Sequence, residues 1–95
     1  IGLEEAQVLV ELDIRAKFRA VAEAREAVNV AQLTREAAAE AFRVVSERYR
    51  LEAALFKDVL EAHTATLRTA QAHQQALSAF WTARAELDQA VGDTP

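Results

Sequence analysis

Cysteine and methionine are absent from the 95 residues, and the residues that interrupt helices lie only at the ends, as Gly2, Gly92 and Pro95. Without cysteine the chain forms no disulfide and performs no thiol chemistry, which leaves its redox compartment undetermined. No run alternates with period two over β-branched or aromatic residues, so strands are not expected. The composition therefore predicts an all-α protein.

Aromatic residues, basic surface and long apolar runs are also scarce. Aromatics make up 6% of the chain, and alanine dominates the 52% of hydrophobic residues, which is little bulk for a globular core. The net charge of −4 comes from 11 basic and 15 acidic residues scattered over both halves, so a nucleic-acid partner is not expected. No apolar stretch reaches the ~18–20 residues of a membrane helix.

The two ends suggest a piece cut from a longer protein. The chain starts on Ile-Gly without an initiator methionine and stops at Asp-Thr-Pro. Glu4 and Glu5 occupy the place where a signal peptide would be cationic. We expect one domain at most, and missing targeting signals say little about the parent protein.

A first helix is predicted over residues 1–50, because apolar residues recur there at spacings of three and four. The mean period is near 3.5, the value of a coiled coil. A second line of mostly small residues would let another helix approach closely. The seam consists of Val10, Ile14, Lys17, Val21, Ala24, Val28, Ala31, Arg35, Ala38, Phe42, Val45 and Tyr49, and the second line includes Leu9, Ala16, Ala20, Ala27 and Ala41.

A second helix is predicted over residues 58–92, and it too carries two apolar lines. Gly92 suits a C-terminal cap and Pro95 follows it, the usual order at a helix stop, with 93–95 as a tail. One line holds Leu60, His63, Leu67, Ala70, Leu77, Trp81 and Val91, with Gln74, Arg84 and Asp88 as polar interruptions, and the other holds Ala76, Phe80, Ala83, Leu87 and Ala90.

Residues 51–57 are predicted to turn, although local propensity alone would continue one helix through them. Asp58 followed by Glu61 fits a helix start, because acidic residues favour the first turn. A single helix of about 90 residues would span roughly 135 Å and leave both apolar lines uncovered, whereas two antiparallel helices cover part of them. We therefore predict a long antiparallel two-helix coiled-coil hairpin.

No group of residues suggests catalysis or metal binding. His63 and His73 lie ten residues apart, without an HExxH pattern. The threonine and serine hydroxyls have no base in a nucleophile pattern. Trp81 beside Phe80 is better explained by packing than by a ligand platform. We expect no enzyme activity, no cofactor and no metal.

Two short motifs stand at the predicted turn. The first, Tyr49-Arg50-Leu51-Glu52, spans the end of the first helix and the start of the turn. The second, Asp58-Val59-Leu60-Glu61-Ala62, opens the second helix. Their order and spacing resemble the periplasmic tip of TolC-like outer-membrane efflux channels, where Tyr-x-x-Gly precedes Asp-Val-Leu-acid-Ala. The similarity covers nearly the whole chain, and the terminal Ala-Val-Gly fits the second of that family's two hairpins.

The resemblance implies a place and a function. The hairpin would be part of the α-helical barrel of a homotrimeric outer-membrane channel of a Gram-negative bacterium, with this segment in the periplasm. The channel would export small molecules or metal ions, with a periplasmic adaptor protein and an inner-membrane pump as partners. Glu52 replaces the family's tip glycine, and a left-handed conformation costs a non-glycine residue roughly 1 kcal/mol, so the place of the turn is open.

The resemblance also implies roles for single residues. The adaptor-docking tip corresponds to Leu51, Glu52, Ala53, Ala54 and Leu55. Asp58 and Glu61 correspond to entrance carboxylates that would attract cations as threefold rings. Tyr49 matches a position near the closure contacts. From the residues alone, Asp58 and Glu61 are better explained as acids that start a helix, and Tyr49 equally well as a seam aromatic.

One alternative belongs to another class, a structural or interaction coiled coil. The hairpin of a periplasmic adaptor (membrane fusion) protein and a helical-bundle scaffold are two examples. A parent gene with flanking β-strands and a second similar hairpin would favour the channel. In either case the second apolar lines predict that the isolated segment self-associates.

Overall fold

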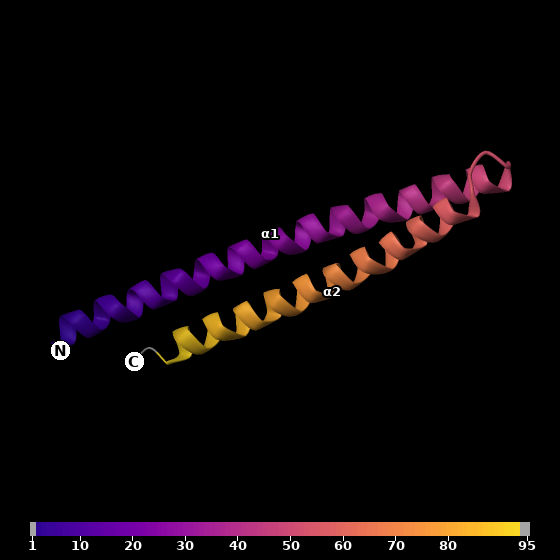
Figure 1. The fold of residues 1–95 in the computed structure, drawn as a ribbon. Coiled ribbons are helices and arrows are strands. Elements are labelled where there is room, and N and C mark those ends of the chain that lie inside the picture. Colours follow the sequence, from indigo (N-terminus) through magenta and orange to yellow (C-terminus); the bar gives the residue numbers. More distant parts are fainter. Residues whose placement is uncertain (1, 94–95) are drawn as a thin grey trace.

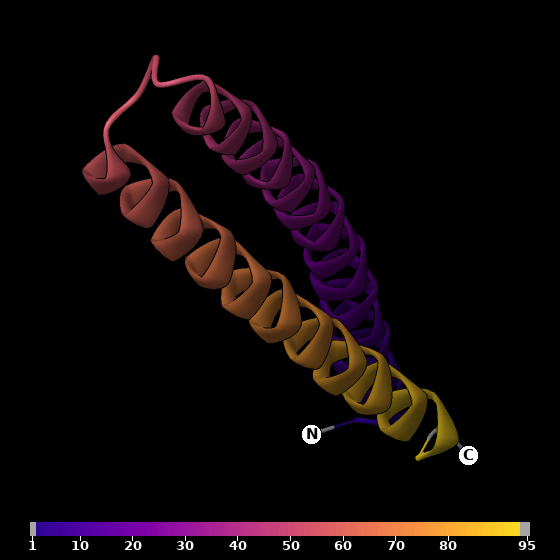
Figure 2. The same cartoon turned by 90° about the vertical axis from the view of Figure 1, so that its right-hand side faces the viewer.

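The computed structural model describes residues 2–93 as two long helices joined by a turn. Helix α1 spans Leu3–Arg50 and helix α2 spans Phe56–Gly92. The helices run side by side in opposite directions (Figures 1 and 2), and the molecule measures 74 × 15 × 13 Å. The predicted all-α antiparallel hairpin is confirmed.

The charges at the ends of α1 match its dipole. Glu4 and Glu5 lie in the first turn, where negative charge is favoured, and Arg48 and Arg50 lie in the last turn, where positive charge is favoured. Gly2 precedes the helix in an extended conformation and offers no side-chain cap. The absence of glycine and proline from the interior lets each helix continue unbroken.

The seam predicted on α1 is the face that packs against α2. Its residues from Ile14 to Val45 are buried or half-buried, except for Arg35, whose side chain remains exposed. The two end members of the predicted seam, Val10 and Tyr49, are exposed at 37% and 45%. The heptad spacing therefore identified the contact face correctly along the paired part of α1.

Only one of the two apolar lines on α2 faces α1. Its buried or half-buried residues keep alternating spacings of three and four along the whole helix. In the other line Ala70 and Leu77 are half-buried, but Leu60, Leu67 and Trp81 are 51%, 58% and 61% exposed. The seam of α2 consists of Val59, Ala62, Thr66, Thr69, His73, Ala76, Phe80, Ala83, Leu87 and Ala90.

Contacts between the helices extend along the full length of the pairing. Near the open end, Lys17 Nζ lies 4.0 Å from the Glu86 carboxylate. Further along, the Arg25 guanidinium stacks on the Phe80 ring, 5.7 Å from its centroid. Phe42 and His63 pack with ring centroids 5.4 Å apart nearer the turn.

The core that these contacts produce is thin. Among residues 2–93, only Val21 and Leu87 are buried, at 8% and 7% exposure. A domain of this length ordinarily removes well over half of its unfolded surface from water, which a single pair of helices does not achieve. Much apolar surface therefore stays open on the outside of the hairpin.

At the open end of the hairpin, α1 extends beyond α2. Helix α1 has 48 residues and α2 has 37, so the first turns of α1 have no helix beside them (Figure 1). Gly92 is the last residue of α2, and Asp93, in a right-handed conformation, caps it. No glycine in the described part has a positive φ, so the expected glycine cap is wrong. Pro95 lies outside the described residues.

Candidate functional site

The turn at the closed end is a Schellman motif in which Glu52 takes the place of glycine. Glu52 has φ of 62°, the left-handed region that glycine usually occupies. The Glu52 N–H donates to the Tyr49 carbonyl at 3.0 Å, and the Ala53 N–H donates to the Arg48 carbonyl at 2.7 Å. The chain therefore turns where the resembled family has glycine, and the two hydrogen bonds satisfy carbonyls at the end of α1.

Helix α2 starts two residues earlier than expected, at Phe56 instead of Asp58. Leu55 is extended and precedes the helix, and its backbone N–H donates to Asp58 Oδ2 at 3.2 Å. This is one half of a capping box, with Asp58 at the third helical position. Leu55 has no side-chain oxygen to return the bond, so Asp58 provides the side-chain hydrogen bond at the start of α2.

The structure brings the predicted tip residues together at one end of the rod. Leu51 and Leu55 are 67% and 68% exposed, and Phe56 beside them is 55% exposed. Glu52 and Ala53 are also exposed, whereas Ala54 is half-buried. The closed end of the hairpin therefore presents several large apolar side chains to its surroundings, with one carboxylate among them.

Asp58 and Glu61 lie three positions apart on α2, and each has a partner within the hairpin. Asp58 accepts the capping bond of Leu55, and Glu61 lies 3.6 Å from Lys57 Nζ, an exposed pair one turn apart. Asp58 lies in the first turn of α2, which fits the interpretation that it starts a helix, whereas Glu61 lies beyond the first turn. Whether they also form carboxylate rings depends on an assembly and stays a prediction.

Tyr49 lies in the last turn of α1 and contacts Phe56 in the first turn of α2. The ring centroids are 5.6 Å apart and the planes are tilted by 51°. The Tyr49 side chain thus contributes to closing the turn, as a seam aromatic would. Its role in channel closure stays a prediction.

The two histidines have different environments, and neither has the neighbours of a metal site. His63 packs on Phe42, whereas His73 sits in the seam with Nδ1 3.4 Å from Arg35 Nη1. Nowhere in residues 2–93 do three or more histidine, aspartate or glutamate side chains gather closely enough to hold a metal ion. Arg35 and His73 form an exposed polar contact at the edge of the seam, and polar residues at seam positions restrict the register of a coiled coil.

Phe80 and Trp81 divide between the seam and the surface. Their rings meet edge to face at 5.3 Å, yet Phe80 is half-buried under Arg25, whereas Trp81 is 61% exposed. Packing within the hairpin therefore explains Phe80, but it covers little of Trp81.

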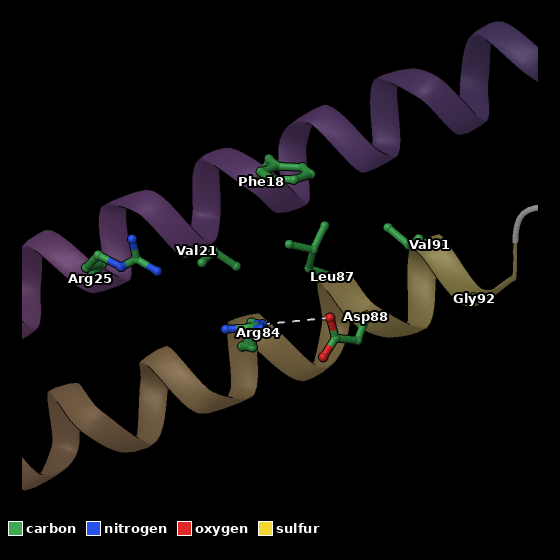
Figure 3. Close-up of a pocket in the computed structure, with 8 residues that line it drawn as sticks. All are labelled: Phe18, Val21, Arg25, Arg84, Leu87, Asp88, Val91 and Gly92. Carbon is green, nitrogen blue, oxygen red and sulfur yellow. Dashed lines mark ion pairs between the residues drawn. The ribbon is translucent and has the colours of Figure 1, made fainter.

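An open groove of about 550 Å³ runs along one flank of the seam near the open end (Figure 3). Phe18 and Arg25 border it from α1, and Arg84, Asp88 and Val91 border it from α2, over a floor of Val21 and Leu87. The Arg84 guanidinium pairs with Asp88 at 3.8 Å across its edge. The apolar lines do not predict this groove, because Phe18 belongs to neither line on α1.

Ion pairs lie on the outer surface of α1. Arg43 donates two hydrogen bonds to the Glu40 carboxylate, at 2.7 and 3.0 Å. These bonds, and next the nearby positive charge, lower the pKa of Glu40 below its ordinary value and raise that of Arg43. The pair is fully exposed and stabilises the helix only weakly.

Neither described helix contains a stretch that is both long and apolar enough to cross a bilayer. Comparisons of the chain with protein-family models, with curated proteins and with solved structures give no match.

Proposed function

We propose that the hairpin is a passive wall segment of a trimeric outer-membrane efflux channel, with its closed end at the periplasmic entrance. The observation that carries this proposal is the turn at Glu52. The motif order places the resembled family's glycine at this residue, and Glu52 takes a left-handed φ of 62° there. A charged residue adopts that conformation only at a cost, so the turn is favoured by more than local preference.

The closed end supports a docking role. Leu51, Leu55 and Phe56 expose large apolar surface at a single point of the rod. Clustered apolar residues that stay exposed mark surfaces that bind another protein. The partner we propose is the helical hairpin of a periplasmic adaptor, contacting residues 51–55, with an inner-membrane pump behind it. The exported compounds would be small molecules or metal ions.

The paired parts of α1 and α2, which we call the shaft, support a role as a passive part of a channel wall. The thin core and the exposed apolar lines on both helices support a position in which neighbouring helices would cover the hairpin. In a threefold assembly, Asp58 and Glu61 would add carboxylates near the entrance, where they would favour cations over anions. We propose no enzymatic activity.

The test uses the full-length protein that carries this hairpin, expressed in a Gram-negative strain that lacks its own channel. Replacing Leu51 and Leu55 together by aspartate is expected to abolish export and adaptor cross-linking, while the amount of outer-membrane trimer stays unchanged. Gln71→Asp, on the exposed face of the shaft, is the matched control and is expected to keep export.

Full export by the tip variant would refute adaptor docking through the tip. A parent chain without flanking β-strands and without a second similar hairpin would instead favour an adaptor hairpin or a helical scaffold.

A further inference from the structure

The seam of α1 continues beyond the end of α2. Val10 and Leu3 lie one and two heptads before the seam residue Lys17, so they belong to the face that packs against α2 further along. Helix α2 ends at Gly92, and the first half-buried residue of α1 is Ile14. In the described part of the chain, no second helix covers the seam before Ile14.

This uncovered part of the seam is mostly apolar. Leu3 and Val10 are 76% and 37% exposed, and Ala6 lies between them beside the one polar seam position, Gln7. Apolar residues that keep the coiled-coil period form a stripe that a further helix can cover. The surface is continuous with the contact between α1 and α2, so a helix in line with α2 fits it.

The same part of α1 is acidic. Residues 3–13 contain four acidic side chains and no lysine, arginine or histidine. Glu4 and Glu11 flank the seam on one side, and Asp13 flanks it on the other. Glu5 lies on the opposite face. None of the four forms an ion pair within the described part of the hairpin, so their charges are free to meet those of a partner.

The end of α2 adds a second observation that favours positive charge. The last turn of α2 has no basic residue, and Asp93 follows it. The carbonyl end of a helix carries partial negative charge, so a cation is favoured there. Lys17, the nearest cation of the seam, lies two turns beyond Val10 and already has Glu86 at 4.0 Å.

We propose that a basic amphipathic helix of a partner protein docks on residues 3–13 of α1, in line with α2. Its apolar face covers Leu3 and Val10, and its basic residues face Glu4 and Glu11. Residues 3–13 span roughly 16 Å, so a partner helix of about three turns is long enough. The inference goes beyond the proposed function and does not rest on it, because this surface lies at the opposite end of the rod from the tip (Figure 1).

Peptide binding tests the proposal. The probe is a fluorescent peptide of about 14 residues, two heptads with leucine at the a and d positions and lysine at the flanking positions. Fluorescence anisotropy is expected to show saturable binding to the 95-residue chain that weakens as salt is added. A scrambled peptide of the same composition, and a peptide with glutamate in place of lysine, are each expected to bind about tenfold more weakly or not at all.

Two pairs of variants separate the apolar contact from the charge. Val10→Asp is expected to weaken binding about tenfold although it adds negative charge, because the apolar contact is lost. Leu12→Asp adds the same charge about 200° around the helix and is expected to keep binding. Glu11→Gln is expected to weaken binding and to reduce its salt dependence, whereas Glu5→Gln, on the opposite face, is expected to do neither. Circular dichroism checks that each variant remains helical.

Four outcomes would overturn the proposal. The first three are no binding of the basic peptide, equal binding of the scrambled peptide, and equal losses from Val10→Asp and Leu12→Asp. The fourth is self-association of the chain that Val10→Asp abolishes and the peptide does not compete with, which would make a second copy the occupant. None of these measurements involves export or the tip residues, so they and the tip experiment can fail separately.

Discussion

Tyr49 and Phe56 pack their rings across the turn, 5.6 Å apart and tilted by 51°. One belongs to the last turn of α1 and the other opens α2, so the contact joins the two helices at the point where the chain reverses. Phe42 and His63 form a second tilted ring contact one heptad further from the turn, with centroids 5.4 Å apart. The turn thus continues the packing of the shaft.

A double-mutant cycle measures this contact. We expect Tyr49→Ala and Phe56→Ala each to destabilise the hairpin, with a coupling of about 0.5 kcal/mol because both rings are partly exposed. Urea unfolding at fixed protein concentration provides the free energies. Leu51→Ala, a tip residue, is the control and is expected to show no coupling to Phe56→Ala, whereas purely additive effects of Tyr49 and Phe56 would contradict this prediction.

Glu52→Gly is expected to stabilise the hairpin by about 1 kcal/mol. Glycine adopts a positive φ without the steric cost that a side chain imposes. Glu52→Ala is the matched control, since it removes the carboxylate but keeps the Cβ, and it should give little gain. Chemical unfolding compares the three proteins, and equal stability of the glycine and alanine variants would show that the strain is not relieved at this position.

Asp58→Ala is expected to destabilise the hairpin by about 1 kcal/mol, because the Leu55 N–H loses its acceptor and the dipole of α2 loses a nearby negative charge. The change should appear as faster amide exchange in the first turn of α2. Glu61→Ala removes only an exposed pair with Lys57 and should cost less. A larger loss from Glu61→Ala would reverse this assignment of roles.

Leu87→Ala is expected to cost about 2 kcal/mol, since Leu87 is one of two buried residues in the described chain. Leu67→Ala removes the same atoms from a side chain that is 58% exposed, and a dilute sample should lose far less stability. Thermal unfolding at several concentrations separates the two effects. If both variants lose equal stability at the lowest concentration, the packing of α2 described above is wrong.

The Glu40–Arg43 pair should make the stability of the folded hairpin decrease slightly at acidic pH. Its two hydrogen bonds lower the pKa of Glu40 from the ordinary 4.5. A lowered pKa in the folded state means that the small stabilisation is present above about pH 4.5 and is lost as the pH falls through the lowered value. Carboxyl NMR titration should show the pKa of Glu40 rising in Arg43→Gln and staying unchanged in Arg50→Gln.

The paired face of α1 could be predicted from sequence because a single line of seam residues keeps the coiled-coil period from Ile14 to Val45. The paired face of α2 could not, since two neighbouring lines have comparable apolar character. Which line faces α1 depends on how α2 is rotated about its axis, and the apolar pattern does not determine that rotation. The turn that leads into α2 contains the left-handed Glu52 and the extended Leu55, which helix propensity does not indicate.

At the tip, too, some features could be predicted from the sequence and others could not. Acidic residues at a helix start indicated the local role of Asp58, although not that Leu55 would be its partner. The groove beside Phe18 needed both helices in place, because its walls come from residues far apart in the chain. The predicted glycine cap at Gly92 is wrong, because α2 ends at Asp93 in an ordinary right-handed conformation.

The unequal lengths of α1 and α2 have a consequence for stability. Every residue from Leu3 to Leu12 is exposed in the hairpin, including the large side chains of Leu3, Leu9 and Leu12. Most of the stability of a helix in a protein comes from packing of its apolar face, which these turns lack within the hairpin. Within the hairpin, α2 therefore stabilises α1 from Ile14 toward the tip, whereas the first turns of α1 can gain packing energy only from a neighbour outside the hairpin.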